Sequence, residues 1–200
     1  MKERPYVIGV TGNTGAGKST AAHALSLAGV KVLDADKIAR ALQQPGQPAL
    51  QHIVNTFGEE MLFPDGSLNR KKLGARVFAD KDELEKLNSI MWPAILKEIS
   101  GQIAQSEADI VIDAALLYET GMQVLCNESW VVTAPEHLRC QRIMRRDGIP
   151  LARARDRMNS QMPQEEKARM ADNVLDGGGT AEELQQQALS LYRAARGNRA

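Results

Sequence analysis

An octapeptide near the start of the chain limits the fold more than any other feature. Residues 12–19 read Gly12-Asn13-Thr14-Gly15-Ala16-Gly17-Lys18-Ser19, which fits the pattern G-x-x-x-x-G-K-[ST] without a mismatch. Glycines allow successive backbone N–H groups to turn inward around an anion, in conformations that a side chain would penalise. An apolar run precedes the octapeptide and a helical pattern follows it. It therefore predicts a phosphate-binding loop between a strand and a helix, with a simple glycine turn as the alternative.

Each residue type in this loop has a chemical reason. The helix that follows offers free N–H groups and the positive end of its dipole to an anion. Lys18 places a positive charge on the β- and γ-phosphates, and the Ser19 hydroxyl can bind Mg²⁺, which otherwise keeps phosphate and water ligands. The expected ligand is a nucleoside triphosphate with Mg²⁺. Its expected contacts are Gly12, Asn13, Thr14, Gly15, Ala16, Gly17, Lys18, Ser19 and Thr20, with Ser19 as the metal ligand.

The chain has no excess charge that could attract an anionic partner through its overall electrostatic field. Among 200 residues, 25 Lys and Arg offset 25 Asp and Glu, so an anion must be held by a local site.

Cys126 and Cys140 form no C-x-x-C pair and are expected to be free thiols. No run is long enough for a membrane span, and residues 6–10 are too short for a leader. We expect a cytoplasmic protein, monomeric or weakly homo-oligomeric, with small-molecule partners but no nucleic-acid or membrane partner.

The rest of the chain alternates short apolar strands with helices. The expected strands are 6–11, 30–33, 110–113, 130–133 and 174–175. The expected helices are 18–27, 37–43, 48–57, 70–78, 81–105 with an interruption near Pro93, 135–147, 151–160, 163–171 and 181–195. This alternation predicts an α/β fold with a five-stranded parallel sheet flanked by helices. We expect a single domain, 1–200, with a helical substrate lobe inserted at about 48–106 and a lid at about 139–165.

Acidic residues follow two of the expected strands. Asp34 and Asp36 lie at the carboxyl end of the second strand, and ligands bind at this edge of a doubly wound sheet. One carboxylate there can accept the proton of an acceptor hydroxyl, and the other is expected to cap the following helix. Asp113, at the end of the third strand, is a candidate for holding Mg²⁺ through water, with a strand-end turn residue as the alternative.

A small-molecule kinase is the activity that these residues favour. The chain has no Asn-Lys-x-Asp stretch, which argues against a GTPase. It has no second ATPase module, which argues against an ATPase motor. Arg142 and Arg146 lie four residues apart on an expected helix, so both can face the triphosphate and neutralise charge. Arg139 and Arg145 are expected on a solvated face. The three histidines are expected at the surface or in packing contacts, and none is assigned to a metal.

The chain resembles the dephospho-CoA kinase family over nearly its whole length. The segments that carry the resemblance are the phosphate loop, Asp34-Ala35-Asp36-Lys37-Ile38-Ala39-Arg40, Leu68-Asn69-Arg70-Lys71-Lys72-Leu73, Leu116-Leu117-Tyr118-Glu119-Thr120-Gly121, Arg142 to Asp147, and Ser160-Gln161. The resemblance implies a P-loop NTPase fold with strand order 2-3-1-4-5. It also implies transfer of the ATP γ-phosphoryl group to the ribose 3′-hydroxyl of dephospho-CoA, the last step of coenzyme A synthesis.

The resemblance further implies roles for individual residues. Asp36 corresponds to the family's general base, Arg142 to its lid arginine, and Lys18 to its phosphate-binding lysine. Arg146 is expected to contact ATP with Arg142. Contacts with the acceptor are implied for Asp34, Asp36, Arg40, Leu117 and Glu119.

Several positions depart from the family pattern. Ala115 stands where Pro is usual, Trp92 where His precedes Pro93, and Asn69 where Asp is usual. The triplet Gly177-Gly178-Gly179 replaces an Asn-x-Gly. Two other functions stay open at this point, namely a nucleoside or nucleotide kinase and a nucleotide-binding protein without turnover. Phosphoryl transfer to dephospho-CoA would separate all three.

Overall fold

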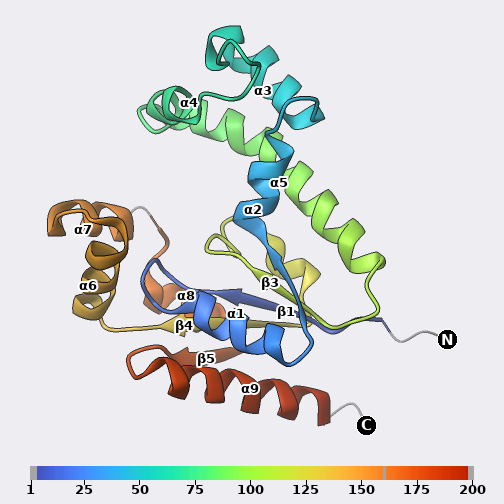
Figure 1. Cartoon of the computed structure of the whole chain (residues 1–200), viewed down its shortest axis with the longest axis vertical. Coiled ribbons are helices and arrows are strands. Elements are labelled where there is room, and N and C mark those ends of the chain that lie inside the picture. Colours follow the sequence, from blue (N-terminus) through green and yellow to red (C-terminus); the bar gives the residue numbers. More distant parts are fainter. Residues whose placement is uncertain (1–3, 160, 198–200) are drawn as a thin grey trace. The chain divides into compact units, whose positions relative to one another are not determined.

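The structure is a computed structural model that describes residues 4–159 and 161–197 (Figure 1). The chain forms two compact units. The first contains Met1–Asp34 and Ile103–Ala200, and the second contains Ala35–Gln102. The first unit holds the sheet and the phosphate-binding loop, and the second is helical. Ser160, half of one motif quoted above, lies outside the described residues.

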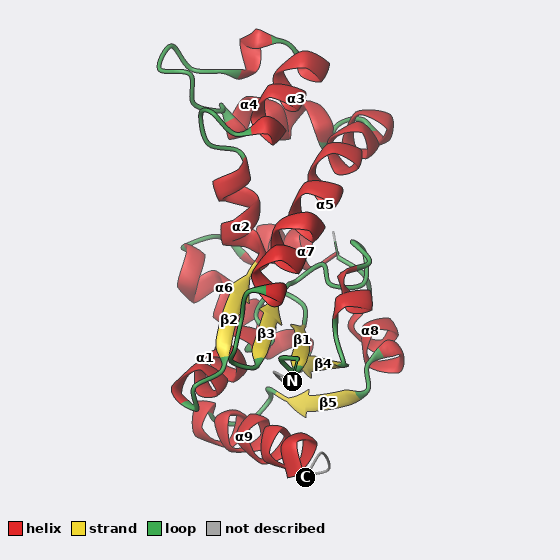
Figure 2. Cartoon of the chain, turned by 90° about the vertical axis from the view of Figure 1, so that its right-hand side faces the viewer, coloured by secondary structure: helices red, strands yellow, loops and turns green. Residues whose placement is uncertain are grey.

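A five-stranded parallel sheet forms the centre of the first unit (Figure 2). Its strands are β1 Val7–Thr11, β2 Lys31–Asp34, β3 Ile110–Asp113, β4 Glu128–Thr133 and β5 Asn173–Asp176. They lie in the order β2-β3-β1-β4-β5, which confirms the predicted order 2-3-1-4-5. The strand ends differ from the prediction by one or two residues, because hydrogen-bonded pairing includes polar residues that hydropathy leaves out.

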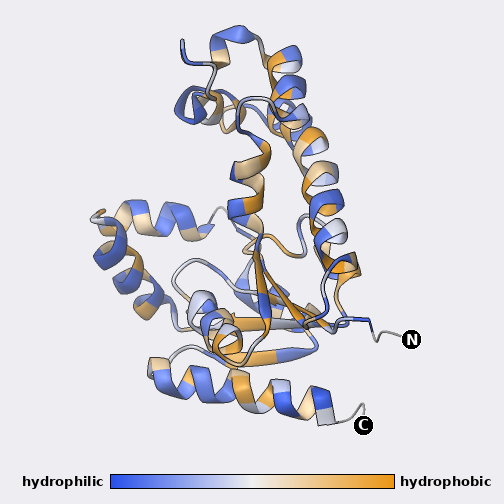
Figure 3. Ribbon diagram, turned by 45° about the vertical axis from the view of Figure 1, so that its right-hand side comes forward, coloured by the Kyte–Doolittle hydropathy of each residue, from blue (hydrophilic) through white to orange (hydrophobic). Residues whose placement is uncertain are grey.

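Helices pack against the sheet. All five residues of β1 are buried. Helices α1 Lys18–Leu27 and α9 Ala181–Gly197 lie side by side against the sheet (Figures 1 and 2). Buried apolar residues of the strands and of the two helices share one core, and Figure 3 shows much of the sheet as orange, hydrophobic ribbon. This core includes Ile8, Val10, Leu25, Trp130, Val132, Leu184 and Ala188.

A pair of helices follows β4. Helices α6 Glu136–Asp147 and α7 Leu151–Asn159 contact each other around a small core. Buried members of this core are Cys140, Ile143, Ala154 and Met158. The chain then forms α8 Gln164–Met170 and enters β5. A short 3₁₀ helix, Met122–Leu125 (η2), lies between β3 and β4 and was not predicted.

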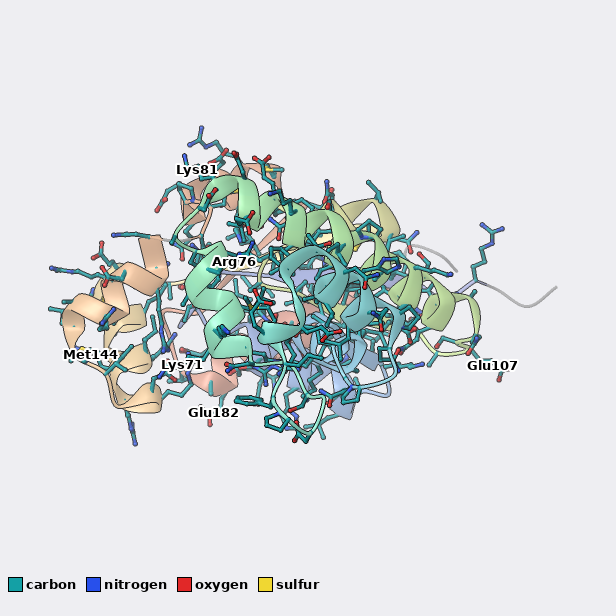
Figure 4. The ribbon with its side chains drawn as sticks, turned by 90° about the horizontal axis from the view of Figure 1, so that it is seen from above. Lys71, Arg76, Lys81, Glu107, Met144 and Glu182 are labelled. Atoms are coloured by element: carbon teal, nitrogen blue, oxygen red, sulfur yellow. The ribbon has the colours of Figure 1, made fainter. Side chains whose placement is uncertain are left out.

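The second unit is built from helices. They are α2 Ala35–Leu42, α3 Pro48–Phe57, the 3₁₀ helix η1 Glu59–Met61, α4 Arg70–Val77 and most of α5 Lys81–Ala104. The Arg76 guanidinium of α4, labelled in Figure 4, lies 5.4 Å from the centre of the Phe57 ring. Its Nε also donates to Glu83 Oε2 of α5 at 2.7 Å. These contacts join three helices of the unit.

Helix α5 runs through Pro93 without a break, so the predicted interruption is wrong. A proline inside a helix costs about 3 kcal/mol, because it removes one N–H donor and crowds the preceding turn. Met91, Ile95 and Ile99 are buried along the same helix. Each such side chain contributes about 1.5–3 kcal/mol when buried, so together they outweigh the proline.

No helix in the described part of the chain is long and apolar enough to cross a membrane.

Candidate active site

The octapeptide forms a loop between β1 and α1. Gly12 and Gly15 have φ angles of 152° and 84°, in the region that favours glycine. A Cβ atom at Gly12 would lie 2.6 Å from the Val132 carbonyl oxygen, and one at Gly15 would lie 2.7 Å from the Arg139 carbonyl oxygen. Side chains at these positions would therefore strain the loop and push it away from β4 and α6.

The loop ends at the N-terminus of α1, with Gly17 as the N-cap residue. The first N–H groups of a helix have no acceptor within it, and the helix dipole adds positive potential at the same place. Ser19 is exposed in this first turn, so its hydroxyl is open to a ligand. The local backbone suits a phosphate group, as the sequence predicts.

Lys18 forms an ion pair with Asp113. Its Nζ contacts Asp113 Oδ1, and the two side chains are 19% and 12% exposed. Asp113 is the last residue of β3, and its Cα pairs with Val10 of β1 on one side and Asp34 of β2 on the other. The carboxyl edge thus carries two acidic residues on neighbouring strands, one of them against the lysine. These carboxylates and the Ser19 hydroxyl are oxygen donors, which Mg²⁺ prefers.

Arg142 lies against the phosphate-binding loop. Its Nη1 donates to the carbonyl oxygens of Gly15 at 3.2 Å and Ala16 at 3.4 Å. The lid arginine named by the resemblance is therefore next to the residues expected to bind phosphate.

Arg146 does not join Arg142 at the loop. Its side chain is 62% exposed, and its Nε donates to Asp147 Oδ1 at 2.7 Å. The hydrogen bond from Arg146 lowers the pKa of the Asp147 carboxyl below its usual value. Arg157 of α7 contacts the same carboxylate. The four-residue spacing therefore does not bring Arg146 to the loop beside Arg142, because Asp147 holds Arg146 at the end of the helix.

Asp34 and Asp36 have different positions in the chain. Asp34 is the last residue of β2, whereas Asp36 is exposed in the first turn of α2. The helix begins at Ala35, two residues before the predicted start, so the positive end of its dipole favours the Asp36 carboxylate. Arg40 follows one turn later and is also exposed. Asp36 and Arg40 belong to the second unit.

The other two expected acceptor contacts have protein partners. Leu117 is fully buried in the core, where its methyl groups cover Gly9. Glu119 Oε1 lies 2.9 Å from Lys167 Nζ and accepts a hydrogen bond from the Met162 N–H at 3.4 Å. The structure thus places Leu117 away from solvent and Glu119 in an ion pair.

Comparison with known proteins identifies the family. A family model described as dephospho-CoA kinase matches residues 6–183. The chain belongs to the dephospho-CoA kinase family. A curated dephospho-CoA kinase from Carboxydothermus hydrogenoformans is 41% identical over 191 residues, which cover 94% of this chain and 93% of the relative. Another, from Anaeromyxobacter dehalogenans, is 44% identical and covers 96% of this chain and 93% of the relative.

Solved structures agree with this assignment to the dephospho-CoA kinase family. A dephospho-CoA kinase from Campylobacter jejuni aligns with a TM-score of 0.71 at 27% identity, over 96% of this chain and 98% of that one. A Thermus thermophilus crystal structure aligns with a TM-score of 0.83 at 29% identity, over the same shares. A shikimate kinase from Acinetobacter baumannii, at 15% identity and a TM-score of 0.55, shares the fold alone. The predicted P-loop kinase fold is thereby confirmed.

Sequence reasoning misplaced one residue of this kinase and missed another. Arg139 was expected on a solvated face, but it is only 8% exposed and its backbone lies against Gly15. Within residues 4–159 and 161–197, its buried Nε and Nη1 have no hydrogen-bond partner. Lys167 is fully buried and was not singled out at all. Helix α8 has seven mostly polar residues, and their sequence does not distinguish Lys167, which is buried, from the exposed cation of the same helix.

Proposed function

We propose that this chain transfers the γ-phosphoryl group of ATP to the ribose 3′-hydroxyl of dephospho-CoA, with Mg²⁺ as cofactor. The observation that carries the proposal is a fully formed phosphate-binding loop in a chain that matches the dephospho-CoA kinase family over residues 6–183. Cys126 and Cys140 are free thiols, and we place the reaction in the cytoplasm.

Binding of the triphosphate begins with an exchange of partners at Lys18. In the structure its ammonium group is held by Asp113. In our proposal the β- and γ-phosphates take the place of that carboxylate, while the N–H groups at the start of α1 bind the same oxygens. Asp113 and Ser19 then supply oxygen atoms for Mg²⁺. When bound, Mg²⁺ would supply positive charge that offsets the charge of the triphosphate.

Asp36 acts as the general base in this proposal. Its carboxylate takes the proton of the acceptor 3′-hydroxyl as the bond from O3′ to the γ-phosphorus forms. The bond from the γ-phosphorus to the bridging oxygen breaks, and ADP leaves with those electrons. Its exposed position in the first turn of α2 supports the role, because the carboxylate is free to meet a hydroxyl. Asp34 and Arg40 are proposed to orient the acceptor beside it.

Arginines of the lid complete the proposed site. Arg142 already contacts the loop through Gly15 and Ala16, and phosphate oxygens would compete for its guanidinium. The buried Nε and Nη1 of Arg139 have no hydrogen-bond partner in the part of the chain that the structure describes, which makes Arg139 a second candidate cation for the nucleotide. Arg146 contacts ATP only if it leaves Asp147. We assign the lid to about 139–165 and the acceptor lobe to about 48–106.

An acceptor screen tests the proposal. The purified protein is given ATP and Mg²⁺ with dephospho-CoA, adenosine, AMP or shikimate, and ADP release is followed in a coupled assay. We expect rapid ADP release only with dephospho-CoA. Faster release with a nucleoside or nucleotide would replace the proposal with the alternative kinase. No release with any acceptor, despite ATP binding, would favour a nucleotide-binding protein without turnover.

A further inference from the structure

The segment that follows the lid helices is hydrogen-bonded to the phosphate-binding loop. Gln161 Oε1 accepts a hydrogen bond from the Thr14 N–H at 2.9 Å. The carbonyl oxygen of Met162 accepts one from Asn13 Nδ2, also at 2.9 Å. Asn13 is buried, so water competes little for this bond. The first half of the loop is thus held from the side by residues 161–162.

Met162 is in turn held by an ion pair whose cation is fully buried. The Met162 N–H donates to Glu119 Oε1 at 3.4 Å, and that oxygen lies 2.9 Å from Lys167 Nζ. Lys167 Nζ also donates to the Ala115 carbonyl oxygen at 2.6 Å. The Lys167 side chain is 0% exposed, whereas the Glu119 side chain is 21% exposed. A continuous set of contacts therefore leads from Lys167 through Glu119 and Met162 to Asn13.

The burial of Lys167 shows that this cation needs its partners. A buried charge without a partner is strongly unfavourable, whereas replacing both charges of a buried pair with apolar groups is often neutral. Stability alone therefore does not require an ion pair at this place. Beyond packing, the pair orients the Glu119 carboxylate, so that Oε1 accepts the hydrogen bond of the Met162 N–H.

We propose that Lys167 and Glu119 are positioning residues for the nucleotide site, acting through Met162 on Asn13 and, through the adjacent Gln161, on Thr14. The pair holds the end of the lid segment against the phosphate-binding loop, so that the loop keeps the shape that receives the triphosphate. This inference rests on the proposed function only in taking the triphosphate as the loop's ligand. It differs from the role implied for Glu119 by the resemblance, which is a contact with the acceptor.

The test compares Lys167→Met with the double variant Lys167→Met/Glu119→Leu. The single variant leaves the Glu119 carboxylate without its cation and is expected to lower the Tm. The double variant removes both charges and is expected to regain most of that Tm. Arg169→Met and Glu166→Gln, exposed on the same helix, serve as matched controls. Isothermal titration with a non-hydrolysable ATP analogue and Mg²⁺, without acceptor, measures the nucleotide Kd of each protein.

We expect the double variant to bind the analogue at least about tenfold more weakly than wild type, the loss expected of one charge-assisted hydrogen bond, although its Tm is restored. The controls should bind normally. A Kd that returns to the wild-type value together with the Tm would overturn the proposal, because the pair would then only support packing. An unchanged nucleotide Kd with a raised acceptor KM would also overturn it and would make Glu119 an acceptor ligand. Because the titration contains no acceptor, a failure to phosphorylate dephospho-CoA would leave this result intact.

Discussion

Lys18 has a carboxylate partner in the structure, and this partner bears directly on nucleotide binding. The pair with Asp113 is mostly shielded from solvent, so salt screens it less than an exposed ion pair. A triphosphate that needs Lys18 must therefore compete with Asp113. In the proposed mechanism, the same carboxylate would supply an oxygen ligand for Mg²⁺ near the phosphates.

Substitution of Asp113 by Asn should separate these two effects. We expect Asp113→Asn to bind Mg²⁺-free ATP about threefold to tenfold more tightly, because Lys18 loses its competing partner. The turnover rate with Mg²⁺ should fall, because the variant would lack the negative charge of the carboxylate proposed to hold the metal. Titrations with and without Mg²⁺, together with steady-state rates, check both parts. Equal ATP affinity in the two proteins without Mg²⁺ would show that the ion pair does not oppose binding.

The choice between two aspartates is the second question at this scale. Asp36→Asn should preserve ATP binding but slow phosphoryl transfer by roughly 10²–10⁴-fold, because an amide cannot take the proton of the acceptor. Asp34→Asn should cost less, because Asp34 ends β2 and is assigned only to orientation. Single-turnover rates at saturating ATP and dephospho-CoA compare them. A near-normal rate for Asp36→Asn with an inactive Asp34→Asn would move the base to Asp34.

At the scale of elements, α6 carries four arginines with different surroundings. Arg142 contacts the loop, whereas Arg145 is exposed. Arg142→Ala is expected to lower kcat by about 10²–10³-fold with a smaller effect on the ATP Kd, because the guanidinium acts on charge that develops in the transition state. Arg145→Ala is the matched control and should be near wild type. A change confined to the acceptor KM would contradict the role of Arg142.

Helix α9 is attached to the sheet by a titratable pair. Tyr192 OH donates to Asp109 Oδ2 at 2.7 Å, and Asp109 Oδ1 accepts from the Tyr6 N–H at 2.9 Å. Burial, followed by the hydrogen bond to Asp109, raises the pKa of Tyr192 to about 12. A tyrosine in an unfolded chain titrates near pH ~10. The contribution of Tyr192 to stability is therefore fully present below pH ~10 and is lost as the pH rises through its folded pKa.

The difference in unfolding midpoint between wild type and Tyr192→Phe should follow this titration. We expect wild type to be more stable at neutral pH and the difference to shrink between about pH 10 and pH 12. Urea unfolding at a series of pH values measures it. A difference that stays constant across this range would mean that the hydroxyl contributes no pH-dependent stability.

The elements that could be predicted are those whose signals are local. The phosphate loop, β1 and α1 follow from glycine spacing, an apolar run and helix periodicity, and they lie where the sequence indicates. Pro93 misled the prediction because its cost is local, whereas the burial that offsets it comes from tertiary packing. The burial of Arg139 and Lys167 depends on contacts with residues distant in the sequence, which no window of sequence contains.

At the scale of the whole molecule, the chain leaves the first unit after Asp34 and returns to it at Ile103, before β3 begins at Ile110. The proposed base, Asp36, belongs to the helical unit, whereas Lys18 and Arg142 belong to the unit with the sheet. The sequence analysis expects Asp36 just after the second strand and a helical lobe at about 48–106, and it does not predict the internal contacts of either unit.

The position of the new phosphate tests the central claim most directly. Wild-type protein and Lys18→Ala are incubated with ATP, Mg²⁺ and dephospho-CoA, and the product is examined by ³¹P and ¹H NMR. We predict one new phosphomonoester whose phosphorus couples to the ribose H3′ proton, formed by wild type and at least about 10²-fold more slowly by Lys18→Ala, because one phosphate-facing cation is lost. Coupling to another ribose proton, or consumption of ATP without a phosphomonoester on dephospho-CoA, would contradict the proposed reaction.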